Sequence, residues 1–333
     1  MTDLLILGAG LGLVGLTLLD AGWTIWWVDG DAGPMTRRLL GGLRALARRP
    51  RGRRLRSLLG PASLVATLMA WFVLIGIGWT LVFASDGASL AATGSLPPPG
   101  LAAKAYYVAY TLLTMGNGDY VPNGTPWQAA TSVAVLSGLV LLTLAITYTM
   151  SVLEGVVKKR TTAMRVHALG ATPAAIVATG LVDGRPRGFD RMLSSLAEQL
   201  ALVTEQHLAY PVLHFYDARD RRVSLSLAAA LLDDAVTLLA SAREAEARPQ
   251  PLALAEARGA IDRYAAVLAR TFVEAEAPPP PPSADGLEAR GFGIDPEALG
   301  RETATGAKRR ARLRGAVEAE GWSWDRDVSG RGA

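Results

Sequence analysis

Three long apolar runs constrain the fold of this chain more than any other feature of its sequence. They cover residues 4–28, 61–83 and 127–153, and Asp20 is the one charged residue within them. A helix needs about 20 apolar residues to cross the hydrocarbon core of a bilayer. Because 50% of the 333 residues are hydrophobic and the mean hydropathy is +0.24, we predict an all-α membrane protein with three transmembrane helices.

A shorter segment, AYYVAYTLLTMGNGDYVP at residues 105–122, lies between the second and third apolar runs. Its helical part is too short to span a bilayer, and irregular backbone at membrane depth is tolerated only where protein buries it or where it lines a water-filled cavity. We therefore predict a re-entrant element, a pore helix and a loop that enter the membrane and return to the same side.

The loop reads Thr-Met-Gly-Asn-Gly-Asp from Thr114 to Asp119. It resembles the selectivity filter of the potassium channel family, Thr-x-Gly-x-Gly-Asp, and residues 61–153 resemble that family's order of outer helix, pore helix, filter and inner helix. The whole chain is similar to bacterial channels of the two-helix pore class, with an extra N-terminal helix and a helical C-terminal domain. The resemblance implies a homotetramer whose filter binds permeant K⁺ through Thr114, Met115, Gly116, Asn117, Gly118 and Asp119.

The chemistry of the loop is compatible with that role. Backbone carbonyls can replace the water that an ion sheds, and four chains complete each ring of oxygens. The lining oxygens that we expect are the carbonyls of residues 114–117 and the Thr114 hydroxyl, with Gly116 and Gly118 supplying unusual dihedral angles. Asp119 is expected at the outer mouth, where it attracts cations or bonds to the pore helix.

Two sets of residues around the loop have two interpretations each. Tyr106, Tyr107 and Tyr110 are either a supporting shell behind the filter or aromatic residues at the membrane interface. Gly138 lies nineteen positions after Asp119, where the family resemblance implies a gating hinge, and the alternative is a glycine that permits close helix packing.

The loop departs from the family at Met115, where Val or Ile is usual, and at Asn117, where an aromatic residue normally braces the filter. We therefore predict passive cation transport more firmly than potassium selectivity. The alternatives are a non-selective cation channel and a non-conducting membrane sensor or scaffold.

Arginines without any acidic residue characterise residues 34–59. Leucines recur there at helical spacing, which indicates an amphipathic helix at the lipid headgroups. A plain cytoplasmic loop is nevertheless the favoured explanation of the charge, because positive-inside bias alone requires it. The arginines expected to face anionic lipid are Arg37, Arg38, Arg44, Arg48 and Arg49. Because basic residues concentrate on the cytoplasmic side, we place the N-terminus outside and the C-terminus in the cytoplasm of a multi-pass protein of the inner (plasma) membrane.

The predicted organisation has five parts. They are an N-terminal transmembrane helix at residues 1–29, a basic linker at 30–60, a pore domain at 61–155, a helical cytoplasmic domain at 156–277, and a Pro-rich linker with a disordered basic tail at 278–333. Within the cytoplasmic domain, leucine and alanine at helical intervals predict helices at residues 189–208, 223–247 and 252–275.

A remote alternative is a membrane-attached enzyme, because Gly10, Gly12 and Gly15 form a GxGxxG pattern typical of dinucleotide-binding sites. The strands and helices that should follow such a motif are missing from the pattern of the sequence. The three histidines match no metal signature, so we expect no metal other than K⁺. We also expect no catalytic residue, no cofactor and no nucleic-acid partner.

Overall fold

The computed structural model describes residues 1–27, 32–47, 53–270, 275 and 277–329. Among these residues, three helices are long and apolar enough to cross a membrane, which confirms the predicted fold class. The chain divides into two compact units, which we call the pore unit and the helical unit. The pore unit comprises Met1–Pro50, Pro61–Val152 and Ala209–Val212, and the helical unit comprises Arg51–Gly60, Leu153–Leu208 and Leu213–Ala333.

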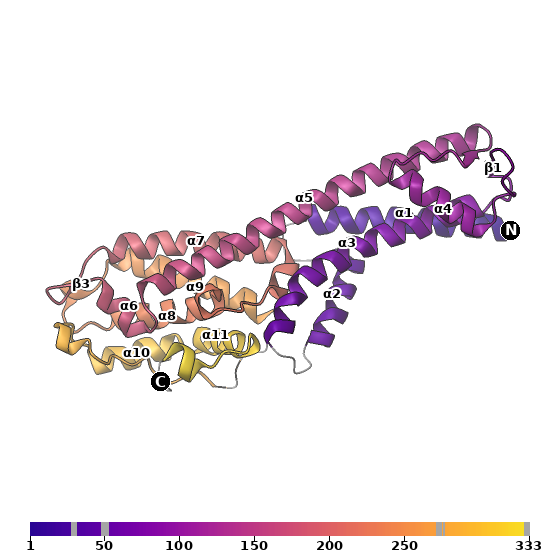
Figure 1. The fold of residues 1–333 in the computed structure, drawn as a ribbon. Coiled ribbons are helices and arrows are strands. Elements are labelled where there is room, and N and C mark those ends of the chain that lie inside the picture. The colour runs from indigo at the N-terminus through magenta and orange to yellow at the C-terminus, as the bar shows by residue number, and fades with distance from the viewer. Residues whose placement is uncertain (28–31, 48–52, 271–274, 276, 330–333) are drawn as a thin grey trace. The chain divides into compact units, whose positions relative to one another are not determined.

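The elements of the pore unit follow the predicted order (Figure 1). They are α1 (Thr2–Trp26), α2 (Pro34–Ala47), α3 (Arg53–Ala84), β1 (Leu90–Ala92), α4 (Leu101–Leu112), β2 (Tyr120–Pro122) and α5 (Thr125–Leu169). The start of α3, up to residue 60, and the end of α5, from residue 153, belong to the helical unit. The second span extends beyond the predicted residues 61–83, since α3 continues through Pro61. The third continues well past residue 153 as one helix, because the charged residues that follow the apolar run are themselves good helix formers.

Glycines allow α1 and α3 to approach closely. A Cβ atom on Gly10 would lie 2.8 Å from the carbonyl oxygen of Gly78, and one on Gly78 would lie 2.8 Å from a methyl group of Val14.

The GxGxxG pattern at Gly10, Gly12 and Gly15 lies inside the continuous helix α1. The dinucleotide-binding alternative is wrong, because that site needs a strand and a turn ahead of its helix.

The helical unit is built around α8 (Leu225–Ala240), whose residues are all buried. Helices α6, α9, α10 and α11 contact it. The other elements are α6 (Pro173–Thr179), β3 (Leu181–Val182), β4 (Arg185–Pro186), α7 (Phe189–Ala209), α9 (Pro251–Ala269), α10 (Pro296–Thr305), α11 (Ala307–Ala319) and the short helical turns η1 (Pro211–Phe215), η2 (Arg221–Val223), η3 (Ala245–Ala247), η4 (Glu288–Arg290) and η5 (Trp324–Val328). The predicted helices at 189–208, 223–247 and 252–275 correspond to α7, α8 and α9.

The predicted disorder of the C-terminal tail is wrong for its described residues. Helix α11 buries Leu313, Ala316 and Val317 in the same core as α8 and α9. Two of its arginines form buried ion pairs with α8: Arg309 Nε lies 2.6 Å from Asp233 Oδ1, and Arg310 Nε lies 2.9 Å from Asp234 Oδ1. Two charges of the basic run are thus neutralised by carboxylates far away in the sequence.

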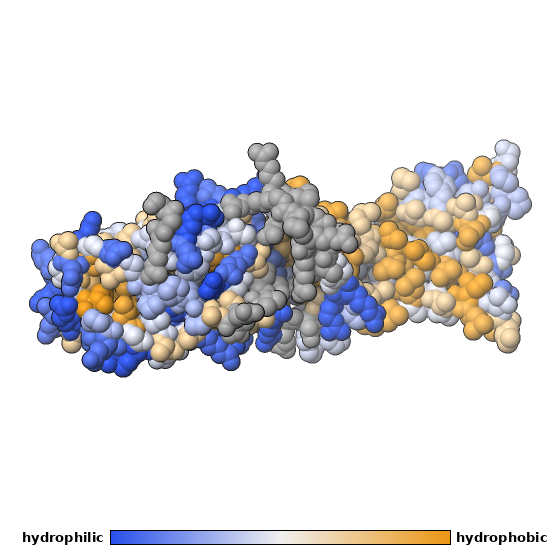
Figure 2. Space-filling model, turned by 90° about the horizontal axis from the view of Figure 1, so that it is seen from below, coloured by the Kyte–Doolittle hydropathy of each residue, from blue (hydrophilic) through white to orange (hydrophobic). Residues whose placement is uncertain are grey.

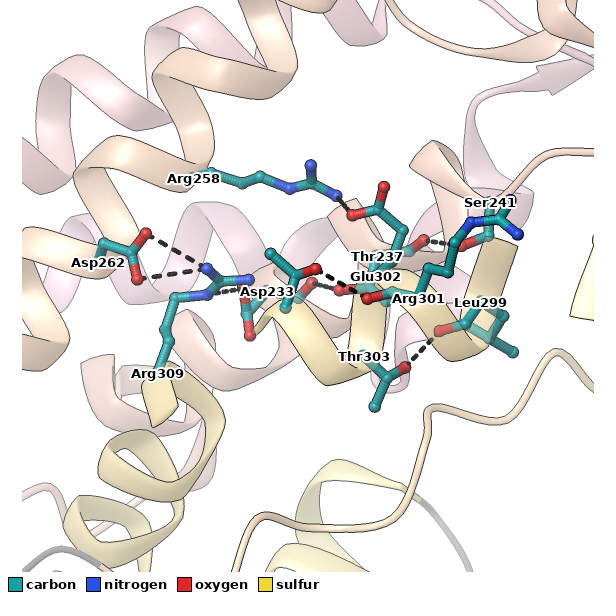
Figure 3. A network of polar contacts seen from close by, with 11 residues as sticks. Asp233, Thr237, Ser241, Arg258, Asp262, Leu299, Arg301, Glu302, Thr303 and Arg309 are labelled. Carbon is teal, nitrogen blue, oxygen red and sulfur yellow. Dashed lines mark hydrogen bonds and ion pairs between the residues drawn. The ribbon is translucent and has the colours of Figure 1, made fainter. Parts of the chain in front are cut away.

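Further polar contacts attach the tail to the rest of the helical unit. Arg309 also pairs with Asp262 of α9 at 3.2 Å, and Arg258 pairs with Glu302 (Figure 3). Arg310 donates to the carbonyl oxygens of Pro279 and Pro280, both at 2.8 Å. The Pro-rich segment is thus fastened to α11 rather than serving as a free linker.

The surfaces of the two units differ in polarity. On the face drawn in Figure 2, apolar residues gather over the pore unit and hydrophilic residues over the helical unit. Most of the large exposed apolar side chains belong to α1, α3 and α5. This distribution is expected if bilayer lipid covers the first unit and water covers the second.

Candidate functional site: the filter loop

Helix α4 is held in place by a buried lysine at its start. The Lys104 side chain is 4% exposed, and its Nζ atom donates to the carbonyl oxygens of Phe83, at 2.9 Å, and Asp86, at 2.6 Å. These carbonyls lie at and just beyond the C-terminal end of α3, where a positive charge is favoured. The sequence reasoning missed this anchor, because a single lysine in an apolar helix does not reveal its partners.

The loop after α4 has an unusual backbone. Thr114, Gly116 and Gly118 adopt positive φ angles of 56°, 62° and 78°. The backbone N–H of Met115 donates to the carbonyl of Tyr110 at 2.8 Å, which joins the start of the loop to the last turn of α4. Left-handed backbone costs a β-branched residue such as threonine about 1–2 kcal/mol. Such strain persists only where the surroundings impose it, and it is common at functional sites.

The tyrosines of α4 pack against one another and bond to neighbouring elements. Tyr107 and Tyr110 are 2% and 4% exposed, and their rings meet edge to face at 5.3 Å. The hydroxyl of Tyr107 lies 2.6 Å from Thr131 Oγ1 of α5, and that of Tyr110 donates to the carbonyl of Tyr120 at 2.8 Å. Of the two interpretations of these residues, the geometry favours the supporting shell.

Tyr106 contacts the filter loop directly. Its hydroxyl donates to Asp119 Oδ2 at 3.1 Å and accepts a short hydrogen bond from Asn117 Nδ2. A polar contact to α4 therefore occupies the place where the family resemblance implies an aromatic brace. The Asp119 carboxylate thus bonds to α4.

The outer part of the loop is tied to a two-stranded ribbon. Strands β1 and β2 pair antiparallel, with Leu90 opposite Pro122 and Ala92 opposite Tyr120. Thr93, directly after β1, donates from Oγ1 to the carbonyl oxygens of Gly118 and Asp119, both at 2.9 Å. Sequence reasoning also missed Thr93, which lies 25 positions before Gly118.

Gly138 lies against the end of the pore helix. A Cβ atom there would lie 2.4 Å from the carbonyl oxygen of Leu112, so no larger residue fits without movement of the backbone. Helix α5 continues through this position without interruption. Close packing is thus observed at Gly138.

The predicted lipid-facing arginines are only partly described. Arg37 and Arg38 lie on α2 with exposed side chains, and Arg44 lies in the same helix. Arg48 and Arg49 lie outside the described residues. Helix α2 begins at Pro34, as the predicted linker helix does.

All three histidines belong to the helical unit. The rings of His207 and His214 are 5.1 Å apart, and His207 is 1% exposed. Burial, reinforced by the charge of Lys159, lowers the pKa of His207 to about 3. Within the part of the chain that the structure describes, no cluster of three or more His, Cys, Asp or Glu side chains could hold a metal ion.

Comparison with known proteins agrees with this geometry. An ion channel family model matches residues 101–155, which include α4, the filter loop and much of α5. The chain is 33% identical over 324 residues to the "Uncharacterized membrane protein YdjJ" of Bacillus subtilis (strain 168), and the match covers 95% of this chain and 94% of that protein. No solved structure matches the chain.

An ion channel domain is a transport module and not an enzyme. A match at this identity over nearly the full length of both chains extends the relationship to the extra N-terminal helix and to the helical unit. The chain therefore belongs to the YdjJ family of membrane proteins and carries an ion channel domain at residues 101–155.

Proposed function

We propose that this chain is the subunit of a homotetrameric cation channel that conducts potassium passively through the loop from Thr114 to Asp119. The observation that carries the proposal is the backbone of this loop, in which Thr114, Gly116 and Gly118 are left-handed while Tyr110, Tyr106 and Thr93 hold it from behind. The backbone carbonyls of such a loop can replace the hydration shell of a permeant ion.

The lining oxygens of the proposal are the carbonyls of Thr114, Met115, Gly116 and Asn117, with the Thr114 hydroxyl. The carbonyls of Gly118 and Asp119 accept hydrogen bonds from Thr93, so these residues shape the outer mouth. The Asp119 carboxylate is partly exposed and adds negative charge there.

Several copies are needed because one chain supplies only a quarter of each ring. Residues 113–118 are all exposed in the single subunit, with Met115 at 59%. An apolar hollow of about 850 Å³ also lies open between α3 and α4, next to Leu142 of α5. Subunit packing and lipid would cover both surfaces.

The orientation and the gate belong to the same proposal. In this proposal α2 lies on the cytoplasmic side at an anionic lipid surface and the N-terminus lies outside, because basic residues favour the cytoplasmic side. Gly138 is the proposed hinge of α5. Because it touches Leu112 at the end of α4, a bend there would act directly on the base of the filter.

Potassium selectivity is the narrower part of the proposal. The hydrogen bond from Asn117 to Tyr106 supports it, because this bond ties the filter to α4 where the family uses an aromatic ring. A loop that this bond fails to hold would pass sodium as well, and the channel would then be non-selective.

The test is cation flux into vesicles that contain the purified full-length protein. Gly116→Ala should abolish most of the flux, because the added methyl disfavours the positive φ of 62°. Gly94→Ala is a matched control: Gly94 has the same φ of 62° and open space around it, but it lies outside the loop. Equal loss in both variants would contradict the filter assignment, and no flux from the parent protein would favour a non-conducting sensor or scaffold.

A further inference from the structure

A buried carboxylate joins three helices of the pore unit. Asp20 of α1 is 1% exposed, and its Oδ1 atom accepts the backbone N–H of Met35 at 2.7 Å. Its Oδ2 atom accepts the Thr36 hydroxyl at 2.6 Å and the indole N–H of Trp71, on α3, at 3.0 Å. Nothing in the proposed conduction mechanism uses this group.

Asp20 caps the start of α2 from a different helix. Met35 and Thr36 are the second and third residues of α2, and Pro34 before them has no N–H to donate. A carboxylate at these N–H groups satisfies them and faces the positive end of the helix. The contact leaves no room for a side chain at Gly33, where a Cβ atom would lie 2.3 Å from Asp20 Oδ1.

Trp71 carries the connection on to the inner helix. Its side chain is 1% exposed, and its ring lies 5.8 Å from that of Tyr148 on α5. Tyr148 is fully buried, and its ring also lies 5.9 Å from that of Tyr210. One side chain, Trp71, thus lies between the cap of α2 and Tyr148 of α5.

Helix α2 presents positive charge to its surroundings. Arg37 and Arg38 are exposed one and two positions after Thr36, and residues 34–59 contain no acidic side chain. Each basic residue near an anionic membrane surface is attracted to it, and a phosphate-bearing headgroup is the chemistry that this charge fits.

We propose that Asp20 is a positioning residue that couples α2 to the inner helix, so that anionic lipid headgroups bound by α2 change the conduction of the pore. The displacement of α2 reaches α5 through the Asp20–Trp71 hydrogen bond and the Trp71–Tyr148 ring contact. The inference rests on the proposed channel function and adds a regulatory lipid to it.

The experiment compares potassium flux through the full-length protein in two kinds of vesicle, pure phosphatidylcholine and equal parts of phosphatidylcholine and phosphatidylglycerol. We expect the flux of the parent protein to differ several-fold between them. In Asp20→Asn this difference should shrink towards none, because an amide offers one acceptor oxygen and sets a donor against the donors of α2. Trp71→Phe should act in the same direction, since it keeps a ring beside Tyr148 but removes the indole N–H.

Two further variants keep the test decisive. Asp3→Asn changes an exposed carboxylate in the first turn of the same helix and should leave the lipid dependence intact. If Asp20→Asn fails to assemble, Thr36→Val removes one bond to the carboxylate at nearly constant shape and takes its place.

The outcomes separate the two proposals. No flux from the parent protein in either vesicle would reject the channel function itself. Flux that ignores the lipid, or a lipid dependence that survives in Asp20→Asn, Trp71→Phe and Thr36→Val alike, would overturn the coupling and leave the channel function standing.

Discussion

The filter loop of the pore unit and the core of the helical unit differ in how they accommodate polar groups. In the filter loop, polar backbone and side chains are left exposed in the subunit, and the surroundings fix their positions through Tyr106, Tyr110 and Thr93. In the helical unit, full charges are buried and neutralised in pairs, as between Arg310 and Asp234. The loop thus leaves polar groups accessible, whereas the helical unit pairs its buried charges with one another.

This difference predicts how each region responds to the loss of a polar contact. Removal of one partner from a buried ion pair leaves an uncompensated charge in a medium that solvates it poorly, so the helical unit should respond by unfolding. Loss of one hydrogen bond behind the filter leaves the fold intact and changes how firmly the loop is held. Three predictions test this contrast, in descending order of expected effect.

The largest effect is expected for Arg310→Met. Burial raises the pKa of the Asp234 carboxyl, and the attraction of Arg310 opposes that rise, so loss of the guanidinium leaves a buried acid without its partner. Breaking a buried pair in this way costs about 3–5 kcal/mol of unfolding free energy. Thermal unfolding of the purified protein, followed by circular dichroism, measures it.

A matched control exists on the surface of the same unit. Arg222 pairs with Asp220 at 3.1 Å, with side chains 78% and 50% exposed, and Arg222→Met should leave the midpoint unchanged. The double variant Arg310→Met with Asp234→Leu should recover much of the loss. Equal unfolding midpoints for Arg310→Met and Arg222→Met would show that the buried ion pair stabilises the fold no more than the exposed one does.

The second prediction concerns pH. Burial, followed by the charge of Lys159, lowers the pKa of His207 from 6.5 to about 3, so the folded protein binds fewer protons than the unfolded chain between these values. Stability should therefore fall as pH falls below 6.5, by about 2 kcal/mol near pH 5 for this group. His207→Phe, which keeps a ring beside Tyr264, should flatten this part of the profile of unfolding free energy against pH. An unchanged slope in the variant would mean that His207 is not the group responsible.

The smallest effect is expected behind the filter. Tyr106→Phe removes the hydroxyl that bonds Asn117 and Asp119, and each bond is worth about 0.5–1.5 kcal/mol. The ratio of potassium to sodium permeability, measured from reversal potentials, should fall several-fold while the unfolding midpoint stays nearly constant. Tyr107→Phe, which loses a bond to Thr131 and touches no filter residue through its hydroxyl, should keep the ratio. If both variants behave alike, the bond to Asn117 does not hold the filter.

Local sequence patterns were enough to predict much of the architecture. Apolar runs longer than a bilayer is thick predicted the three spans, and leucine and alanine at helical spacing predicted α7, α8 and α9. The loop from Thr114 to Asp119 was identified by its resemblance to a selectivity filter, and its two glycines adopt positive φ angles, as expected. These properties depend on residues that are neighbours in the chain.

The prediction that the tail is disordered rested on its charge composition and was wrong for the described residues. When only its neighbours in the sequence are considered, the basic run of α11 is predicted to be exposed to water. Its ordering depends on Asp233 and Asp234, each 76 positions before its arginine partner. Which charges meet across such distances depends on how the helices pack, and no local pattern carries that information.

The sequence by itself determined a membrane protein with three spans and a loop rich in glycine between the last two. Only the tertiary structure decided what holds that loop and what connects the helices. Thr93 forms a hydrogen bond to the outer carbonyls of the loop, Tyr106 to Asn117, and Asp20 to Trp71, 51 positions away. The physical reason is that hydrophobicity and backbone preference act within a segment, whereas a hydrogen bond between buried side chains forms only after packing brings both partners within about 3 Å.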